Sequence, residues 1–205
     1  VAASLGQDAY DRFQMTMRWY YQFPLVEIVA VVGSAHLHVL AGLMRILRRR
    51  KTLKIEGRRE SPSLRVRFHR YTGWFLMLVV SGHMAATRVP GLMGHPADFS
   101  FLNFSLTYMA YAMYPYYVAL VLSGLYHGLH GTAVALRVVG AKLPQWATDP
   151  ASKPFWTAVA VGSLAVLAGV FALGGNLFRP DTARFSEWQA FYEQYVPASM
   201  LPWKK

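Results

Sequence analysis

The chain of 205 residues has no cysteine and few acidic residues. The absence of cysteine excludes disulfides, thiolate metal sites, protein-bound iron–sulfur clusters and cysteine nucleophiles. Any redox chemistry therefore requires a bound cofactor. Only ten acidic residues stand against 21 lysines and arginines, which gives a net charge of +11. Such a charge raises the question of a nucleic-acid or membrane partner.

Hydrophobic residues make up 54% of the chain and fall into long runs that are almost free of charge. They do not recur at the periods of an amphipathic helix or strand, so a lipid bilayer is the simplest solvent for them. The basic residues concentrate between two of these runs, which is typical of a loop beside anionic lipid headgroups. This placement argues for a bilayer and against nucleic acid as the partner.

We predict an all-α integral membrane bundle of four transmembrane helices, over residues 24–44, 68–89, 107–136 and 154–177. The first run has 21 residues with Glu27 as its only formal charge, which is enough to cross a core of about 30 Å. Residues 90–106 contain several helix breakers and are predicted as a loop. Pro115 predicts a kink near the start of the third helix. Residues 1–23 and 178–205 mix charged and aromatic residues, as amphipathic surface segments do.

The loops between the runs differ in charge, and this predicts an orientation. The first connection carries eleven basic residues: Arg45, Arg48, Arg49, Arg50, Lys51, Lys54, Arg58, Arg59, Arg65, Arg67 and Arg70. The third connection holds Arg137, Lys142 and Lys153, whereas the second has little beyond Arg88. Four spans place connections one and three on the same side. Basic loops favour the inner side of a membrane, so both termini are expected on the outer side.

Six of the seven histidines lie in or at the edge of a predicted span. They are His36 and His38 in the first, His69 and His83 in the second, and His127 and His130 in the third. An ionisable side chain in hydrocarbon is costly and faces a partner or a cavity. A neutral histidine hydrogen-bonded between helices is one explanation. Since carboxylates and thiols are absent nearby, haem iron with histidine ligands suits the set better than zinc.

The depth of each histidine follows from its distance to the basic end of its own span. His36 lies nine residues from that end and His127 ten, which correspond to roughly 13 and 15 Å. His83 lies thirteen residues away, roughly 20 Å, or about one helical turn nearer the other side. We therefore expect His127 and His83 to ligate haem iron, with His36 as a further candidate.

Helical spacing gives the direction of the remaining histidines. His36 and His38 are two residues apart and point to nearly opposite sides, so at most one faces a cofactor. His127 and His130 are three apart and share a face. His69 lies at headgroup level among arginines, where hydrogen bonding to a haem propionate or a quinone is its natural task.

Two short motifs resemble the cytochrome b membrane-anchor subunit of succinate dehydrogenase and fumarate reductase. Residues 69–73 read His-Arg-Tyr-Thr-Gly and resemble the motif that opens the first membrane helix of that family. Residues 126–131 read Tyr-His-Gly-Leu-His-Gly and resemble the motif of its next helix, which contains an axial haem ligand. The likeness covers about residues 63–175. It implies that His127 ligates haem b and that Arg70 lies by the quinone pocket and the haem propionates.

The resemblance implies a subunit that is not catalytic alone and passes electrons to ubiquinone or another quinone. Arg70, Tyr71 and Trp74 are the expected quinone neighbours, although Tyr71 and Trp74 also suit plain interfacial anchors. The basic inner loop is expected to dock flavoprotein and iron–sulfur subunits, beside other membrane subunits. The expected location is the mitochondrial inner membrane, or alternatively a bacterial inner membrane.

Two other functions stay open. One is a haem-binding or haem-free accessory membrane subunit of a mitochondrial respiratory assembly, without a dehydrogenase of its own. The other is a purely structural subunit whose haem site is degenerate.

Overall fold

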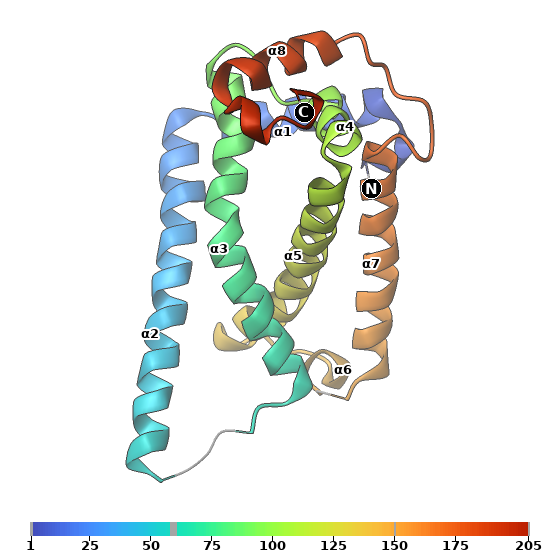
Figure 1. Cartoon of the computed structure of the whole chain (residues 1–205). Coiled ribbons are helices and arrows are strands. Elements are labelled where there is room, and N and C mark those ends of the chain that lie inside the picture. The colour runs from blue at the N-terminus through green and yellow to red at the C-terminus, as the bar shows by residue number, and fades with distance from the viewer. Residues whose placement is uncertain (1, 58–60, 150, 205) are drawn as a thin grey trace.

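The computed structural model describes residues 2–57, 61–149 and 151–204, and these residues form helices without any strand (Figure 1). Four helices are long and apolar enough to cross a membrane. They are Val26–Ile55, which comprises the π-helix η2 (Val26–Gly33) and α2 (Ser34–Ile55), then α3 (Leu64–Leu92), α5 (Ala110–Val138) and α7 (Lys153–Leu173). The prediction of an all-α membrane bundle with four spans is confirmed. The chain is an integral membrane protein.

The first membrane helix does not end where the run of basic residues begins. We expected the first span to stop at residue 44, but α2 continues through the arginines and lysines to Ile55. Arginine and lysine are good helix formers, so charge ends the apolar run without ending the helix. The basic connection is therefore largely a helical extension of α2 that reaches below the other spans (Figure 1). Arg58 and Arg59 of that connection lie outside the described residues.

The prediction of a loop over residues 90–106 is wrong. Helix α3 runs through Pro90 to Leu92, and a separate helix, α4, spans Phe99–Tyr108. Helix α4 begins at Asp98, whose side chain accepts a hydrogen bond of 3.1 Å from the amide of Phe101. An aspartate in this position satisfies one of the free amides at a helix start. The chain then leaves helical geometry at Met109 before α5 begins, so the break precedes Pro115.

Both termini lie at the end of the bundle opposite the basic connection, beside α4 (Figure 1). The segments predicted at residues 1–23 and 178–205 contain α1 (Gln7–Tyr21) and α8 (Phe185–Tyr195). We call α1, α4 and α8 the terminal cap. Trp188 is its largest fully buried side chain, packs on Phe101 and donates a hydrogen bond of 2.8 Å to Ser100. The cap is thus an aromatic core that joins the middle of the chain to its C-terminal part.

A polar network closes the surface of the terminal cap. Arg184 donates to Glu187 at 2.7 and 2.8 Å and also pairs with Asp98. The ring of His95 lies 2.8 Å from the same Glu187 carboxylate. The hydrogen bonds from Arg184, and then that from His95, lower the pKa of Glu187 to about 2. These bonds tie the loop before α4 to α8.

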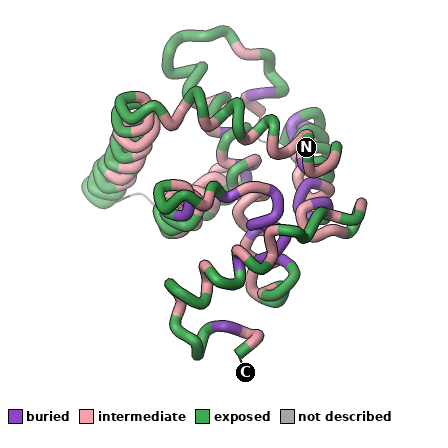
Figure 2. The backbone as a smooth tube through the Cα atoms, turned by 90° about the horizontal axis from the view of Figure 1, so that it is seen from above, coloured by how far each residue is buried: buried purple, intermediate pink, exposed green. Residues whose placement is uncertain are grey.

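Helix α2 stands apart from the other spans. Helices α3 and α7 both pack on α5, whereas α2 runs at the edge without a buried residue (Figure 2). Near the terminal cap, Arg88 of α3 donates two hydrogen bonds of 2.7 and 2.8 Å to Glu27. From there α2 and α3 diverge toward the basic end (Figure 1). The single acidic residue predicted inside the first span is therefore paired, and it fixes α2 at one end.

We predict that Glu187→Gln weakens the terminal cap in a pH-dependent manner. A carboxyl whose pKa is lowered on folding stabilises above its ordinary pKa of 4.5, and this stability is lost as the pH falls toward about 2. The difference in Tm between wild type and variant should be largest above pH 4.5 and close to zero at about pH 2. Because the side chain is partly exposed, the effect is small, about 1 kcal/mol or less. A pH-independent difference would contradict the assigned ion pair.

Candidate functional site

Four histidines from three helices meet in the half of the bundle nearer the basic end. The rings of His69 on α3 and His127 on α5 are stacked, with centroids 4.1 Å apart and planes at 14°. The ring of His130 lies 4.7 Å from His69, and that of His38 on α2 lies 5.9 Å from His127. We call these four residues the histidine cluster. It combines four of the six histidines that the sequence placed in spans, and one of them, His38, was not favoured as a ligand.

Two glycines allow α3 and α5 to approach at the cluster. A Cβ atom on Gly73 would lie 3.0 Å from Cε1 of His127, so tight a contact that the ring would have to shift by a few tenths of an ångström. On the other helix, a Cβ atom on Gly131 would lie 3.5 Å from Cε1 of His69. Each stacked ring therefore lies against a glycine of the opposite helix. Glycine weakens a helix by roughly 1 kcal/mol relative to alanine. Here the absence of a glycine side chain leaves room for the imidazole ring.

The hydrogen bonds of His127 define its tautomer. Its Nδ1 lies 3.3 Å from the backbone oxygen of His69. A carbonyl oxygen only accepts, so Nδ1 carries the proton and donates. The lone pair of the neutral ring is then on Nε2. Histidines that ligate metals hold their other nitrogen in this way, so His127 is prepared for ligation through Nε2.

His130 has the opposite tautomer, because its partner is an arginine. Nε of Arg65 donates to Nδ1 of His130 at 3.1 Å, and a guanidinium has no acceptor. The proton of neutral His130 is therefore on Nε2, and the ring offers no free lone pair for a metal. His130 is a fixed hydrogen-bond donor within the cluster.

Arg65 is almost completely buried at 2% exposure, unusual for an arginine, and the sequence did not single it out as a site residue. It donates to the backbone oxygens of Ala147 at 2.7 Å and Asp149 at 2.9 Å, and it lies 3.4 Å from the centroid of the Phe155 ring. These contacts join α3 to α6 (Gln145–Thr148) and to the start of α7. Arg65 thus holds the third connection against the cluster and places a positive charge beside His130.

His69 contributes the least satisfied polar atom of the cluster. Its Nδ1 is buried and has no hydrogen-bond partner among the described residues. An unsatisfied buried polar atom costs about 1–3 kcal/mol, so a ligand that binds it recovers free energy. This atom is a structural sign that the cluster is built to receive a further group.

The structure does not bring His83 to the cluster. Its Nδ1 is 3.0 Å from the hydroxyl of Tyr116, and it lies fourteen residues from His69, about 21 Å along α3. His83 and His127 therefore do not reach one iron, and the expected pairing of these two ligands is corrected. The prediction measured the depth of each histidine along its own helix. It took no account of the angles at which the tilted helices cross.

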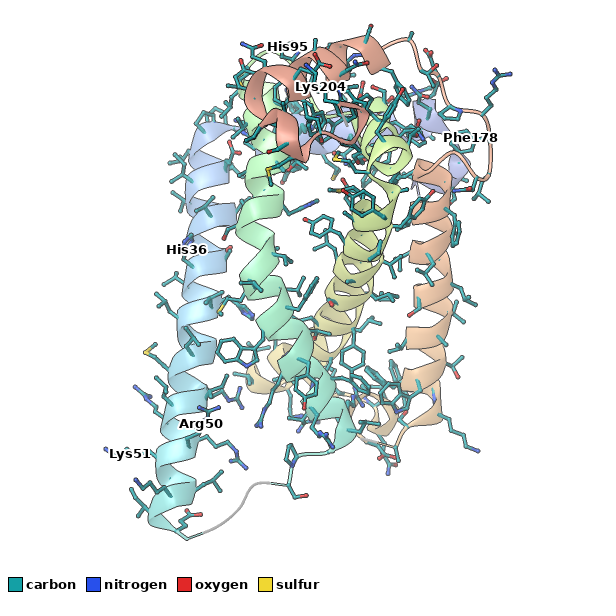
Figure 3. All side chains as sticks on the ribbon, viewed as in Figure 1. His36, Arg50, Lys51, His95, Phe178 and Lys204 are labelled. Carbon is teal, nitrogen blue, oxygen red and sulfur yellow. The ribbon has the colours of Figure 1, made fainter. Side chains whose placement is uncertain are left out.

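His36 also lies outside the cluster. Its ring is on the side of α2 that faces away from the other spans, and its Nδ1 donates to the oxygen of Val32 at 2.7 Å (Figure 3). His38, two residues further, contacts His127 instead. The rule that only one of the pair faces inward holds, and the inward residue is His38.

The three expected quinone neighbours lie in the first turns of α3, at the basic end. Arg70 is half-buried, whereas Tyr71 and Trp74 are 61% and 44% exposed. Both aromatic rings are therefore accessible from outside the bundle. Arg70 follows His69 directly, so its backbone joins these exposed residues to the cluster.

The donor chemistry of the cluster fits haem. Among the described residues, no group of three or more histidines or carboxylates has the geometry to hold a metal ion by itself. Haem brings four donors of its own and requires only one or two imidazoles from protein. His69 and His127 are not the two ligands of one iron, because stacked rings lie on the same side of it. His127 is the residue that fits as a ligand.

We predict that Gly73→Ala disturbs the cluster, whereas Gly82→Ala on the same helix does not. Alanine improves a helix by up to about 1 kcal/mol, and a Cβ at Gly82 meets nothing within 4 Å. At Gly73 the clash with His127 should cancel this gain and lower the Tm measured in detergent. Equal stabilisation by both substitutions would show that the ring of His127 is not held against α3.

Comparisons with family models, with curated proteins and with solved structures return no match for this chain. The likeness to succinate dehydrogenase subunits thus remains a resemblance of two short motifs, at residues 69–73 and 126–131. The geometry of those two motifs is the basis on which a function is proposed.

Proposed function

We propose that the protein binds haem b through Nε2 of His127 and is the membrane-anchor subunit of a succinate:quinone oxidoreductase that passes electrons to quinone. One observation supports this most. His127 lies inside a membrane helix bundle with its Nδ1 proton held by a backbone carbonyl, which leaves the lone pair of Nε2 for ligation.

The meeting of the two sequence motifs is the second support. Residues 69–73 and 126–131 are separated by more than fifty positions, yet each provides a histidine and a glycine to the same contact. His69 stacks on His127, and each ring lies against the other motif's glycine. This meeting supports the interpretation of the two motifs as parts of one site.

Bound haem would supply one-electron chemistry at its iron, and the protein would supply ligation, orientation and charge. His127 would hold the iron. The buried charge of Arg65 and the neighbouring Arg70 favour carboxylates such as haem propionates at the basic end. His130 offers an N–H donor there, because its tautomer is fixed by Arg65.

Quinone would be bound beside the start of α3. Arg70 is a charged donor for a quinone oxygen, and the exposed rings of Tyr71 and Trp74 give an apolar surface that a lipid-soluble molecule reaches from the bilayer. A quinone bound there would be close to the cluster, since Arg70 adjoins His69. Short separation is what electron transfer between the two groups requires.

The basic end would dock the flavoprotein and iron–sulfur subunits. Helix α2 extends a row of arginines and lysines beyond its apolar part, and complementary charge steers such encounters. Other membrane subunits would cover the exposed sides of the bundle. The proposed membrane is the mitochondrial inner membrane, or alternatively a bacterial inner membrane.

We predict that His127→Ala abolishes haem binding or converts the haem to a high-spin form. The measurement is the absorbance of the purified, dithionite-reduced protein, in which low-spin haem b gives a sharp α-band. His95→Ala is the matched control, since His95 lies in the loop before α4, at the opposite end of the bundle, and should leave the band unchanged. A wild-type protein without an α-band would refute haem binding altogether.

We predict that Arg70→Ala lowers succinate-dependent quinone reduction at least about tenfold, about 1.4 kcal/mol of transition-state stabilisation, while haem is retained. The assay uses the complete complex in membranes. Arg67→Ala removes an exposed charge one turn earlier and serves as the control. Loss of haem in Arg70→Ala with normal helix content would assign Arg70 to a propionate instead of a quinone.

A further inference from the structure

Helix α2 reaches the histidine cluster through one side chain. It is fixed to α3 by the pair of Glu27 and Arg88 near the terminal cap, and no residue of its apolar stretch is buried. Toward the basic end it diverges from α3 (Figure 1). Even so, the ring of His38 lies 5.9 Å from that of His127. Helix α2 thus contributes little to packing but places the imidazole of His38 at the site.

The spacing of His38 and His127 matches that of two ligands on one iron. With metal–nitrogen bonds of about 2 Å, imidazoles on opposite sides of a metal have ring centroids about 6 Å apart. The observed separation is 5.9 Å, and the ring planes are at 85°. The stacked pair of His69 and His127 is too close at 4.1 Å. Of the rings near His127, that of His38 has the spacing of a second axial ligand.

The other histidines of the spans are engaged elsewhere. His130 accepts from Arg65 at Nδ1 and so carries its proton on Nε2. His83 pairs with Tyr116 about 21 Å along α3 from His69. His36 and His38 are both exposed, but the ring of His36 points away from the other spans and donates to the oxygen of Val32, whereas that of His38 contacts His127 (Figure 3). These contacts leave His38 as the available partner for His127.

We infer that His38 is the second axial ligand of the iron held by His127, so that a single chain provides both ligands. This inference rests on the proposed binding of haem. It assigns a function to the first span, which is not part of the region that resembles the three-span family. The Glu27–Arg88 pair then acts as a positioning contact that sets the depth of α2.

The test is the spin state of haem in the purified chain, with His38→Ala compared with His36→Ala. The two positions are two residues apart on one helix, but only His38 faces the cluster. We expect His38→Ala to retain haem through His127 in a high-spin state, and His36→Ala to stay low-spin. Added imidazole should restore the low-spin spectrum of His38→Ala by occupying the vacated position.

His38→Met provides a second variant in case His38→Ala fails to fold. A thioether can ligate haem iron and raises its reduction potential, so a low-spin haem of higher potential is expected. A low-spin spectrum in His38→Ala without added imidazole, or an unchanged potential in His38→Met, would overturn this inference while leaving His127 as a ligand. Absence of haem from the wild type would refute the proposed function as well.

Discussion

Polar side chains in a bilayer must find their partners inside the protein, and this constraint organises the structure. Hydrocarbon offers no hydrogen bonds, so each buried donor or acceptor without a partner is costly. The pairs that satisfy it are Glu27 with Arg88, His83 with Tyr116, His130 with Arg65, and His127 with the carbonyl of His69. Each pair joins α3 to another helix. Helix α3 is therefore the helix at which these polar pairs meet, and among the described residues Nδ1 of His69 stands out as a buried imidazole nitrogen left without a partner.

The sequence predicts the spans well, because crossing a bilayer depends on composition alone, which is local. The sequence does not predict elements whose structure depends on contacts between residues far apart in the chain. Helix α4 consists mostly of apolar residues that directly follow glycine and proline breakers, and its formation depends on burial against Trp188, more than eighty residues later. The basic part of α2 shows a different limit. A run of arginines marks where the membrane ends, but arginine's helix propensity carries the helix on to Ile55.

The candidate site is predictable to the level of its motifs, but not to the level of its ligands. Helical spacing does hold a signal for Arg65, which precedes His69 by one turn, just as His130 follows His127 by nearly one turn. Those two steps place Arg65 and His130 on the same side of the site. The choice between His36 and His38 has no such signal. Apart from Glu27, residues 24–44 carry no formal charge on any side, so their composition alone does not reveal which side faces the bundle.

The division of the bundle into a packed unit and a peripheral helix bears on how the site is assembled. Helices α3, α5 and α7 bring the two motifs together by their own packing, and the stacked rings need nothing from α2. Helix α2 is fixed to α3 by an ion pair at one end and meets the cluster by a ring contact further along. That ion pair fixes the depth of the first span beside α3 without fixing the separation of the two helices further along. A group bound between His38 and His127 would hold them together there, so ligand binding and docking of α2 would stabilise each other.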